Sequence, residues 1–399
     1  MAYVACSFYD ARGSLPVYRP RRRRQLSPPL LLAAYCLAVL VLPPPRLSRA
    51  ATSSSSSSTV VTHLPGFDGP LPFYLETGYV EIEEETGAEL FYYFVESERS
   101  PSTDPLLLWL TGGPRCSVFS ALVFEIGPLK FVVEPYDGTL PRLVYNPYSW
   151  TQMASILFLD SPVGSGFSYA RDPKAYEVGD ISSSRQVLTF LRKWFDDHPK
   201  YFLDRPFYIG GDSYAGKVVP LIAHYISEGD KIDTNSKVTF SHSFGIISNQ
   251  QYEEYRYYLS YFWANDNVVR IALGIKEGTM AEWIRCRRPP ILPYASDLPS
   301  SIKYFFNLST KGYRALVYSG DHDLLVPFTG TQAWIGSFNF SIVDDWRAWH
   351  LDNQAAGFTI MYASNLTFAT IKGGSHIPPE TNPKESFTMA KRWLDNEPL

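Results

Sequence analysis

Residues 207–216 read Phe207-Tyr208-Ile209-Gly210-Gly211-Asp212-Ser213-Tyr214-Ala215-Gly216. An apolar run comes first, small residues follow, and after the serine the apolar residues recur at helical spacing as far as Ile226. This order predicts a buried strand, a tight turn that carries Ser213, and a helix whose N-terminus favours negative charge. The alternative is that Ser213 or Asp212 only caps the helix.

A serine hydroxyl becomes a good nucleophile only when a base takes its proton, so an acid and a histidine are expected downstream of Ser213. Two carboxylates, Asp321 and Asp323, follow one short apolar run, and His376 follows another on a glycine-rich stretch. Of the seven histidines, His376 has the most suitable context, whereas His350 lies among tryptophans and is interpreted as structural.

The rest of the chain predicts an α/β fold. Two β-prone runs around a Glu-Thr-Gly-Ala turn predict a hairpin at 79–95. Short apolar runs, typical of strands that are buried on both faces, occur at 106–110, 156–159, 207–209, 316–318 and 368–371. Helical patterns lie between them at 187–195, 218–226 and 383–394. This alternation predicts a mostly parallel sheet with helices on both faces.

Composition excludes some classes of function. The chain has 399 residues and a formal net charge of -4, with its one dense basic run near the N-terminus, so no nucleic-acid partner is expected. No motif suggests a metal site or a phosphate-binding loop, and no cofactor is expected.

The N-terminus resembles a secretory leader. A basic run at 19–24 precedes thirteen apolar residues at 30–42, too few for the roughly 20 that span a membrane, and small residues follow. We predict a signal peptide over 1–50 and a disordered spacer over 51–63; an uncleaved anchor is the alternative. The resulting location is the secretory pathway, with no stable membrane span after cleavage. Sequons begin at Asn307, Asn339 and Asn365.

Five ordered motifs together resemble the plant serine carboxypeptidase-like family, from Leu64 to the C-terminus. The motifs are Trp109-Leu110-Thr111-Gly112-Gly113-Pro114, Leu159-Asp160-Ser161-Pro162-Val163-Gly164-Ser165-Gly166-Phe167-Ser168-Tyr169, Gly211-Asp212-Ser213-Tyr214-Ala215-Gly216, Ser319-Gly320-Asp321-His322-Asp323 and Gly373-Gly374-Ser375-His376. The resemblance implies an α/β-hydrolase domain over 64–399 with a reduced cap region, and delivery outside the cell or to the vacuole.

The resemblance also implies roles for single residues. Ser213 would be the nucleophile, His376 the general base and acid, and Asp323 the residue that orients the imidazole. The backbone N–H groups of Gly113 and Tyr214 would form the oxyanion hole. Cys116 and Cys286 match a cysteine pair that is disulfide-bonded in the family; the residues alone leave two free thiols open.

Thr111, Glu125 and Asp212 match the positions that bind a peptide's terminal carboxylate in the family's carboxypeptidases. Clustered carboxyls favour one protonated member, which can donate a hydrogen bond to a carboxylate. Those peptidases usually carry Asn at the first position and Glu at the last. Thr111 and Asp212 are more similar to the acyltransferase branch, which transfers an acyl group from a glucose ester to an alcohol or amine. The expected partners are therefore a small acyl donor and acceptor, or else a peptide C-terminus.

The sequence departs from the family at two places. Arg115 occupies a glycine position; if φ is positive there, we expect strain of about 1 to 2 kcal/mol and a cation near the oxyanion loop. After Gly229 a strand of the sheet and part of the cap segment are missing, so 238–240 could form a new pairing. These departures motivate a further alternative, a truncated and inactive relative.

Overall fold

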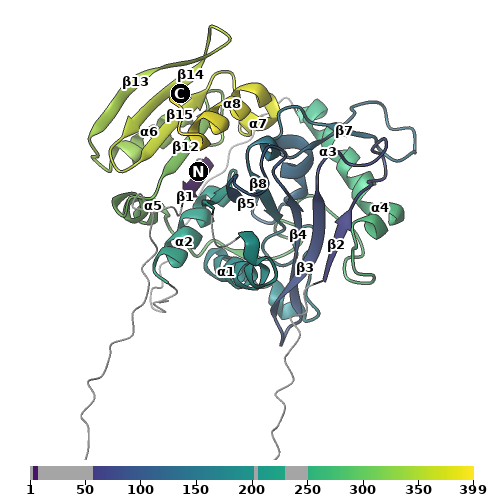
Figure 1. The fold of residues 1–399 in the computed structure, drawn as a ribbon. Helices are drawn as coiled ribbons and strands as arrows, with labels where there is room; N and C mark the ends of the chain where they lie inside the picture. The colour runs from purple at the N-terminus through teal and green to yellow at the C-terminus, as the bar shows by residue number, and fades with distance from the viewer. Residues whose placement is uncertain (1–2, 8–56, 202–204, 230–249) are drawn as a thin grey trace, which may run out of the picture.

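The computed structural model describes residues 3–7, 57–201, 205–229 and 250–399 (Figure 1). Their centre is one mixed sheet with the strand order β13-β14-β15-β12-β1-β10-β5-β8-β4-β3-β2. Its strands are β1 (Tyr3–Ser7), β2 (Ser57–Val61), β3 (Leu75–Glu83), β4 (Ala88–Val95), β5 (Leu106–Leu110), β8 (Ser155–Leu159), β10 (Phe207–Gly211), β12 (Ala315–Gly320), β13 (Ile342–Leu351), β14 (Gln354–Tyr362) and β15 (Leu366–Ile371).

The parallel pairs of this sheet are β10 with β5, β5 with β8, and β12 with β15. The other neighbours are antiparallel, including the predicted hairpin of β3 and β4. The strands that the apolar runs predicted are therefore present, and the α/β-hydrolase fold is confirmed. The sheet is mixed and not mostly parallel as predicted, because hairpins extend both of its edges and β1 runs antiparallel between β10 and β12.

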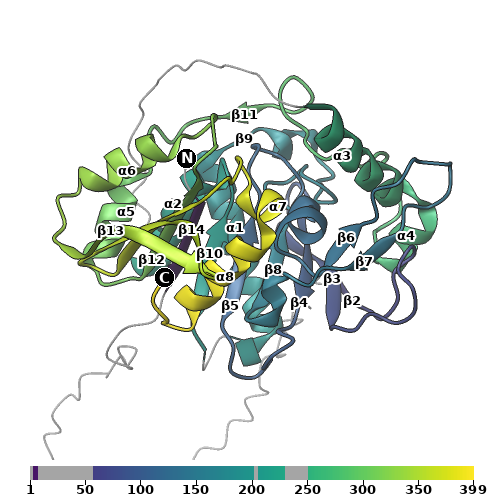
Figure 2. The same ribbon diagram turned by 90° about the horizontal axis from the view of Figure 1, so that it is seen from above.

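Hydrophobic residues of the central strands alternate between the two faces of the sheet. In β5, Leu107 and Trp109 belong to one buried cluster, and Leu106, Leu108 and Leu110 belong to the other. Helices α1 (Asp180–Asp197), α2 (Ala215–Ser227), α5 (Ile302–Thr310) and α6 (Phe328–Gly336) cover the second cluster. Helices α3 (Gln250–Asn265), α4 (Asn267–Ala272) and α8 (Pro383–Leu394) cover the first (Figure 2).

Shorter elements complete the described part of the chain. They are the strand pairs β6 (Leu129–Phe131) with β7 (Leu143–Tyr145) and β9 (Val178–Gly179) with β11 (Tyr294–Ala295), helix α7 (Pro378–Thr381), and the turns η1 (Ala121–Glu125), η2 (Trp150–Gln152), η3 (Pro173–Tyr176) and η4 (Pro199–Tyr201). No helix of the described ranges is long and apolar enough to cross a membrane.

Strand β1 occupies the place between β10 and β12 where the sequence lacks a strand. It pairs antiparallel with both neighbours, Ala5 facing Gly210 on one side and Leu316 on the other. The pairing considered for 238–240 lies outside the described residues. β1 belongs to the segment predicted as a signal peptide, and it joins the two halves of the sheet.

Strand β2 corrects the predicted spacer over 51–63. Ser57–Val61 pairs antiparallel with β3 at one edge of the sheet, with Val61 buried and Val60 exposed. The serine run at 53–58 favours disorder, but Thr59, Val60 and Val61 follow it directly, and their β-branched side chains favour an edge strand.

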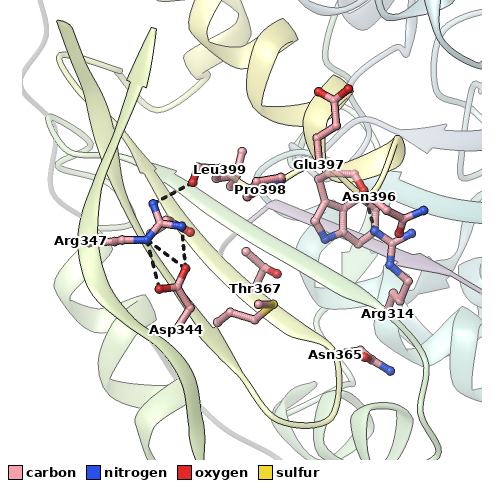
Figure 3. A pocket seen from close by; sticks show the side chains of 12 residues that line it. Arg314, Asp344, Arg347, Asn365, Thr367, Asn396, Glu397, Pro398 and Leu399 are labelled. Atoms are coloured by element: carbon pink, nitrogen blue, oxygen red, sulfur yellow. Dashed lines mark hydrogen bonds and ion pairs between the residues drawn. The ribbon is translucent and has the colours of Figure 1, made fainter. Parts of the chain in front are cut away.

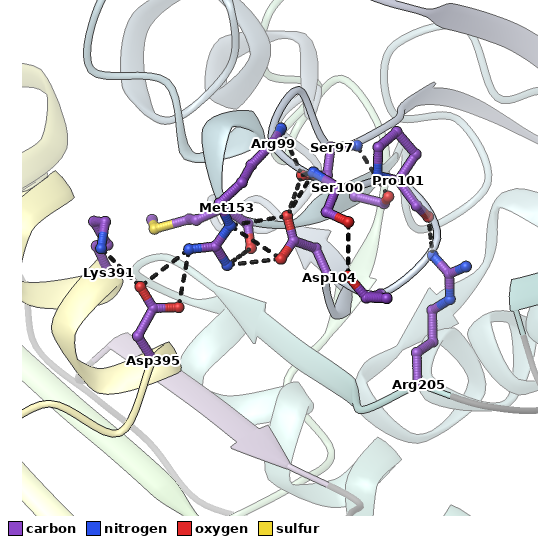
Figure 4. A network of polar contacts seen from close by, with 11 residues as sticks. Ser97, Arg99, Ser100, Pro101, Asp104, Met153, Arg205, Lys391 and Asp395 are labelled. Atoms are coloured by element: carbon purple, nitrogen blue, oxygen red, sulfur yellow. Dashed lines mark hydrogen bonds and ion pairs between the residues drawn. The ribbon is translucent and has the colours of Figure 1, made fainter.

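The C-terminal helix α8 is fixed to the sheet by a charged network (Figure 4). Arg99 lies between two carboxylates, 2.7 Å from Asp104 and 3.1 Å from Asp395 at the end of α8. Lys391 makes a second ion pair with Asp395 at 2.7 Å. The network therefore joins the end of α8 to the segment between β4 and β5.

Candidate active site

Ser213 lies on a sharp turn between β10 and α2. Its φ angle is 50°, in the left-handed region that is unfavourable for a residue with a side chain. A Cβ atom at Gly211 would lie only 2.5 Å from the carbonyl oxygen of Leu110. The small residues before the serine are therefore required by the closeness of β5, and the turn has the geometry expected of a nucleophile elbow.

Two loops bring the acid and the histidine together. Strands β12 and β15 are parallel neighbours, so their carboxyl ends share one edge of the sheet. Gly320 packs so closely on the next loop that an added Cβ would lie 2.2 Å from the carbonyl oxygen of Gly374. The amide of His322 donates to the same carbonyl at 3.0 Å. Asp323 and His376 follow these contacts directly.

Ser213, His376 and Asp323 form one chain of hydrogen bonds. Nδ1 of His376 lies 2.9 Å from Oδ2 of Asp323, and Nε2 lies 2.8 Å from Oγ of Ser213. Since a carboxylate can only accept, Nδ1 carries the hydrogen and Nε2 is free to accept the serine proton. The arrangement can perform acyl transfer through a serine ester.

The environment of Asp323 keeps it ionised. Burial would raise its pKa, but hydrogen bonds from His376 and from the amides of Val326 and Leu325 outweigh burial, so the pKa lies below its usual value. The two amides donate to Oδ1 at 3.0 and 2.8 Å. Asp321, the other candidate acid, instead accepts from the amide of Gly373 at 2.6 Å.

The two predicted oxyanion donors lie on segments that touch. A Cβ atom at Gly112 would lie 2.6 Å from the backbone nitrogen of Tyr214, so the loop before Gly113 is pressed against the elbow. Gly113 has a φ of 119°, and a Cβ there would lie 2.6 Å from Sγ of Cys116. Both glycines are therefore fixed by close approach.

Arg115 has the positive φ that was expected, 67°, but its charge is directed into the protein. The side chain is only 1% exposed, and it donates to the carbonyl oxygens of Val163, Tyr176 and Pro293. Burial lowers the pKa of Arg115 to about 10. The prediction of a cation near the oxyanion loop is corrected in one respect, because the guanidinium points away from the loop and donates to carbonyls inside the protein.

Thr111, Glu125 and Asp212 form a buried polar region next to Ser213. Among the described residues, neither carboxylate oxygen of Glu125 nor Oγ1 of Thr111 has a hydrogen-bond partner. Oδ1 of Asp212 accepts from the amide of Gly112 at 3.3 Å. Glu125 ends η1, a π-helical turn, a type of turn frequent at functional sites.

The environment shifts the pKa of both carboxyl groups of this region upward. Burial, and then the charges of Asp212 and Glu380, raise the pKa of Glu125 well above its usual value. Burial raises the pKa of Asp212 to about 6, although the charge of His376 and the amide of Gly112 oppose it. A protonated Glu125 can donate a hydrogen bond into the site.

Sequence reasoning did not identify Glu380 and Arg256 as neighbours of this region. Nη2 of Arg256 lies 2.7 Å from Oε2 of Glu380, and the hydroxyl of Tyr257 donates to the same oxygen at 3.0 Å. Glu380 stands four residues after His376, a spacing that could have suggested a role. Arg256 carried no local signal, because it comes to the site from α3.

The remaining predicted sites are the cysteine pair and the three sequons. Cys116 and Cys286 form a disulfide. The sequon residues Asn307, Asn339 and Asn365 are all exposed, and Nδ2 of Asn365 donates to the carbonyl of Gly312 at 3.1 Å. No group of three or more potential metal ligands occurs in the part of the chain that the structure describes.

A cavity of about 350 Å³ lies beside the C-terminus (Figure 3). Its lining includes Arg314, Arg347, Thr367 and Trp393, and no member of the triad. This cavity is therefore separate from the candidate active site.

Comparisons with known proteins agree with this geometry. The family model for serine carboxypeptidase matches residues 65–247 and 242–396. Serine carboxypeptidase-like 2 of Arabidopsis thaliana is 43% identical, covering 85% of this chain and 93% of its own, and serine carboxypeptidase-like 17 is 42% identical with the same coverage.

A solved structure shows the same fold. Kex1(Δ)p, a prohormone-processing carboxypeptidase from Saccharomyces cerevisiae, has a TM-score of 0.69 at 17% identity, covering 84% of this chain and 95% of its own. The family match spans most of the sequence and includes all three residues of the hydrogen-bonded chain. The chain therefore belongs to the serine carboxypeptidase family.

Proposed function

We propose that this protein forms an acyl-enzyme on Ser213 and transfers the acyl group from a glucose ester to an alcohol or amine. The observation that carries the proposal is the hydrogen-bonded chain from Ser213 through His376 to the buried Asp323. A serine in this arrangement gives its proton to Nε2 as Oγ attacks a carbonyl carbon. The amides of Gly113 and Tyr214 would stabilise the oxyanion.

Each step balances within the triad and the two substrates. The ester C–O bond to glucose breaks as the glucose oxygen takes the proton from Nε2 of His376. The acceptor then gives its proton to the same nitrogen, attacks the acyl carbon and displaces Oγ of Ser213, which recovers the proton. Asp323 stabilises the imidazolium that forms in each half of the reaction.

Thr111 and Asp212 support transfer from a sugar ester. Oγ1 of Thr111 is buried without a partner among the described residues, and a hydroxyl can both donate and accept. Asp212 is one methylene shorter than the glutamate usual in the peptidases, and its Oδ1 is used by Gly112. The carboxylate-binding set of a carboxypeptidase is therefore incomplete at two of its three positions.

Glu125 favours a second candidate function, removal of C-terminal residues from peptides. Its raised pKa supports a carboxyl group that donates a hydrogen bond to a substrate carboxylate. Peptidase activity of this kind would be lost as pH rises through the raised pKa of Glu125.

Labelling with a fluorophosphonate tests the common step. We expect the purified full-length chain to be labelled at pH 5 to 6, and Ser213→Ala and His376→Ala to remain unlabelled. The matched control is His350→Ala, an exposed histidine of β13, which should label at the parent rate. Absence of labelling in a folded parent would overturn the proposal in favour of an inactive relative.

Substrate competition separates the two candidate functions. An aromatic glucose ester with an alcohol acceptor should give the transferred ester, whereas an N-blocked dipeptide should react at least about tenfold more slowly in kcat/KM. Faster release of an amino acid from the dipeptide would instead establish the carboxypeptidase.

We also propose that the protein enters the secretory pathway. Loss of mass on treatment with an N-glycosidase would support this proposal.

A further inference from the structure

A buried carboxylate that is not part of the triad lies close to the elbow. Asp180, the first residue of α1, has no solvent exposure. Its Oδ1 accepts from the hydroxyls of Tyr214 at 2.8 Å and Tyr294 at 3.0 Å, and its Oδ2 accepts from the amide of Leu298 at 2.9 Å. Nζ of Lys217 lies 2.9 Å from Oδ2. These contacts of the Asp180 carboxylate therefore come from Tyr214, from helix α2 and from residues 293–298.

Residues 293–298 run across the elbow, and we call them the strap. The hydroxyl of Tyr214 lies 2.9 Å from Oγ of Ser296, and Lys217 donates to the same oxygen at 2.6 Å. The rings of Tyr214 and Tyr294 meet edge to face at 5.7 Å. The side chain that follows the nucleophile is thus held by Asp180 and by the strap together.

The strap also holds the loop of the other predicted oxyanion donor. Nε and Nη2 of Arg115 donate to the carbonyl of Pro293, the first strap residue, at 3.0 and 2.7 Å. The carbonyl of Arg115 accepts from the amide of Arg287 at 3.0 Å. Arg115 is two residues from Gly113, so the Gly113 amide is tied to the same strap as the Tyr214 amide.

We propose that Tyr214, through its phenol, and Arg115, through its guanidinium, are positioning residues that hold the two oxyanion amides against the strap, with the Asp180–Lys217 pair as its buried anchor. The proposal rests on the proposed function, because it takes Ser213 as the nucleophile. Donors that are fixed before the reaction need no reorganisation as negative charge develops, and an error of a fraction of an ångström weakens them.

The buried ion pair is better explained by positioning than by stability. Such a pair contributes little net stability compared with apolar residues of similar size, although losing one partner is costly. Here both charges contact Tyr214 or its partner Ser296, and neither contacts the triad in any hydrogen bond among the described residues. Their placement beside one backbone donor suits a geometric role.

The two tyrosines whose hydroxyls donate to Asp180 provide a matched pair of variants. Tyr214→Phe and Tyr294→Phe each remove one hydroxyl from the same carboxylate oxygen, at 2.8 and 3.0 Å, but only Tyr214 belongs to the elbow. Both variants should lose similar thermal stability. We expect Tyr214→Phe to lower the second-order rate of fluorophosphonate labelling at least about tenfold. Tyr294→Phe should lower it less than about threefold, because the amide of Leu298 still joins the strap to Asp180 at 2.9 Å.

Arg115→Lys extends the test to the other amide. Lysine keeps the positive charge but cannot reach three carbonyls in a fork, so labelling should slow by a similar factor. The double variant Arg115→Lys with Tyr214→Phe should slow labelling by less than the product of the two single-variant factors, because both side chains act through one strap. If the labelling rate of the double variant fell by the full product of the two factors, the two side chains would act independently and not through one strap.

Hydrogen exchange gives a readout that does not require an active serine. In Tyr214→Phe, peptides that contain Gly113 and Tyr214 should exchange faster than in Tyr294→Phe. Equal labelling and equal exchange in the two variants would overturn the positioning role. If the parent does not label, the proposed function fails, and faster exchange restricted to Tyr214→Phe would still support the strap.

Discussion

The imidazole of His376 contacts Ser213 at 2.8 Å, although 163 residues separate them in the sequence. The contact depends on Asp323, which orients the ring from the opposite side. Replacing Asp323 by Asn would leave the size of the side chain unchanged but favour the wrong tautomer of His376. We expect the rate of acylation to fall by about 10³ to 10⁴-fold, with the fold retained.

Stopped-flow release of the leaving group from an activated ester would measure this rate. Asp321→Asn is the matched control, since Asp321 lies two residues away and accepts from the Gly373 amide, outside the triad. If both variants lost the same activity, Asp323 would not have the role proposed for it.

Glu125 should make the protein less stable as pH rises. Its folded pKa is raised by burial, whereas in the unfolded chain it ionises near its usual 4.5, so the folded state holds the extra proton above that pH. The free energy of unfolding should therefore fall from pH 4.5 upward, by at most about 1.4 kcal/mol per pH unit for this group. Asp212 adds to the decline up to about pH 6.

Urea unfolding at pH 4.5, 5.5 and 6.5 measures this decline. Glu125→Gln should flatten it and gain stability over the parent as pH increases, while the exposed Glu85→Gln should follow the parent. A steeper decline in Glu125→Gln would contradict the assignment.

His198 and Glu76 form a second pH-dependent pair, at 2.9 Å. Burial opposes both charges, but their mutual hydrogen bond, with support from Tyr92 and the Trp194 carbonyl, raises the pKa of His198 and lowers that of Glu76. The stabilisation that His198 contributes is complete below its usual pKa of 6.5, and it is lost as pH rises through the raised pKa of the folded state. The glutamate contribution is complete above 4.5 and is lost as pH falls.

His198→Gln should therefore cost most between pH 4.5 and 6.5, by about 1 to 2 kcal/mol. The difference in melting temperature from the parent should narrow as pH rises above 6.5 through the raised pKa of His198, and as pH falls below 4.5 through the lowered pKa of Glu76. A difference that stays constant over this range would show that packing on Trp194, and not charge, is what the substitution removes.

Arg115→Gly restores the glycine of the family at a φ of 67°. Relief of strain should return about 1 kcal/mol, but several buried hydrogen bonds to carbonyls are lost at about 1 kcal/mol each. We expect a net destabilisation of about 2 kcal/mol, measured by urea unfolding. A gain in stability would mean that the carbonyls find other partners without the guanidinium.

Residues 1–50 can be tested by removal. Without β1, the facing edges of β10 and β12 lose their hydrogen-bond partners, and such edges favour self-association. A chain that starts at Ala51 should melt lower and form oligomers in gel filtration, and a peptide of residues 1–8 should reverse both effects. An unchanged monomer would show that β1 is dispensable.

Local signals were sufficient for most of the fold. Each short apolar run became a strand, and Pro383 began a helix as its position predicted. Strand β1 could not be predicted, because its pairing joins residues more than 200 positions apart and its sequence resembles part of a leader. Pairings of that range are set by which edge is left open, not by local preference.

The triad could be predicted because each of its residues follows a local pattern in the sequence. Ser213, Asp323 and His376 each follow a strand whose pattern is visible, and parallel strands bring their ends to one edge. The strap could not be predicted, because residues 293–298 have little apolar pattern. They also act through Asp180, whose position in the sequence indicates only the start of a helix. The direction of the Arg115 side chain likewise depends on carbonyls from three distant segments.

The position of β1 has a consequence for how this protein would mature. If residues 1–50 act as the signal peptide that the sequence predicts, β1 cannot be in the translocation channel and in the middle of the sheet at once. Folding before cleavage would hide the leader from the peptidase, and cleavage before folding would leave two half-sheets with facing open edges. The order of these two events, more than any single contact, would then decide whether the catalytic edge of the sheet is ever assembled.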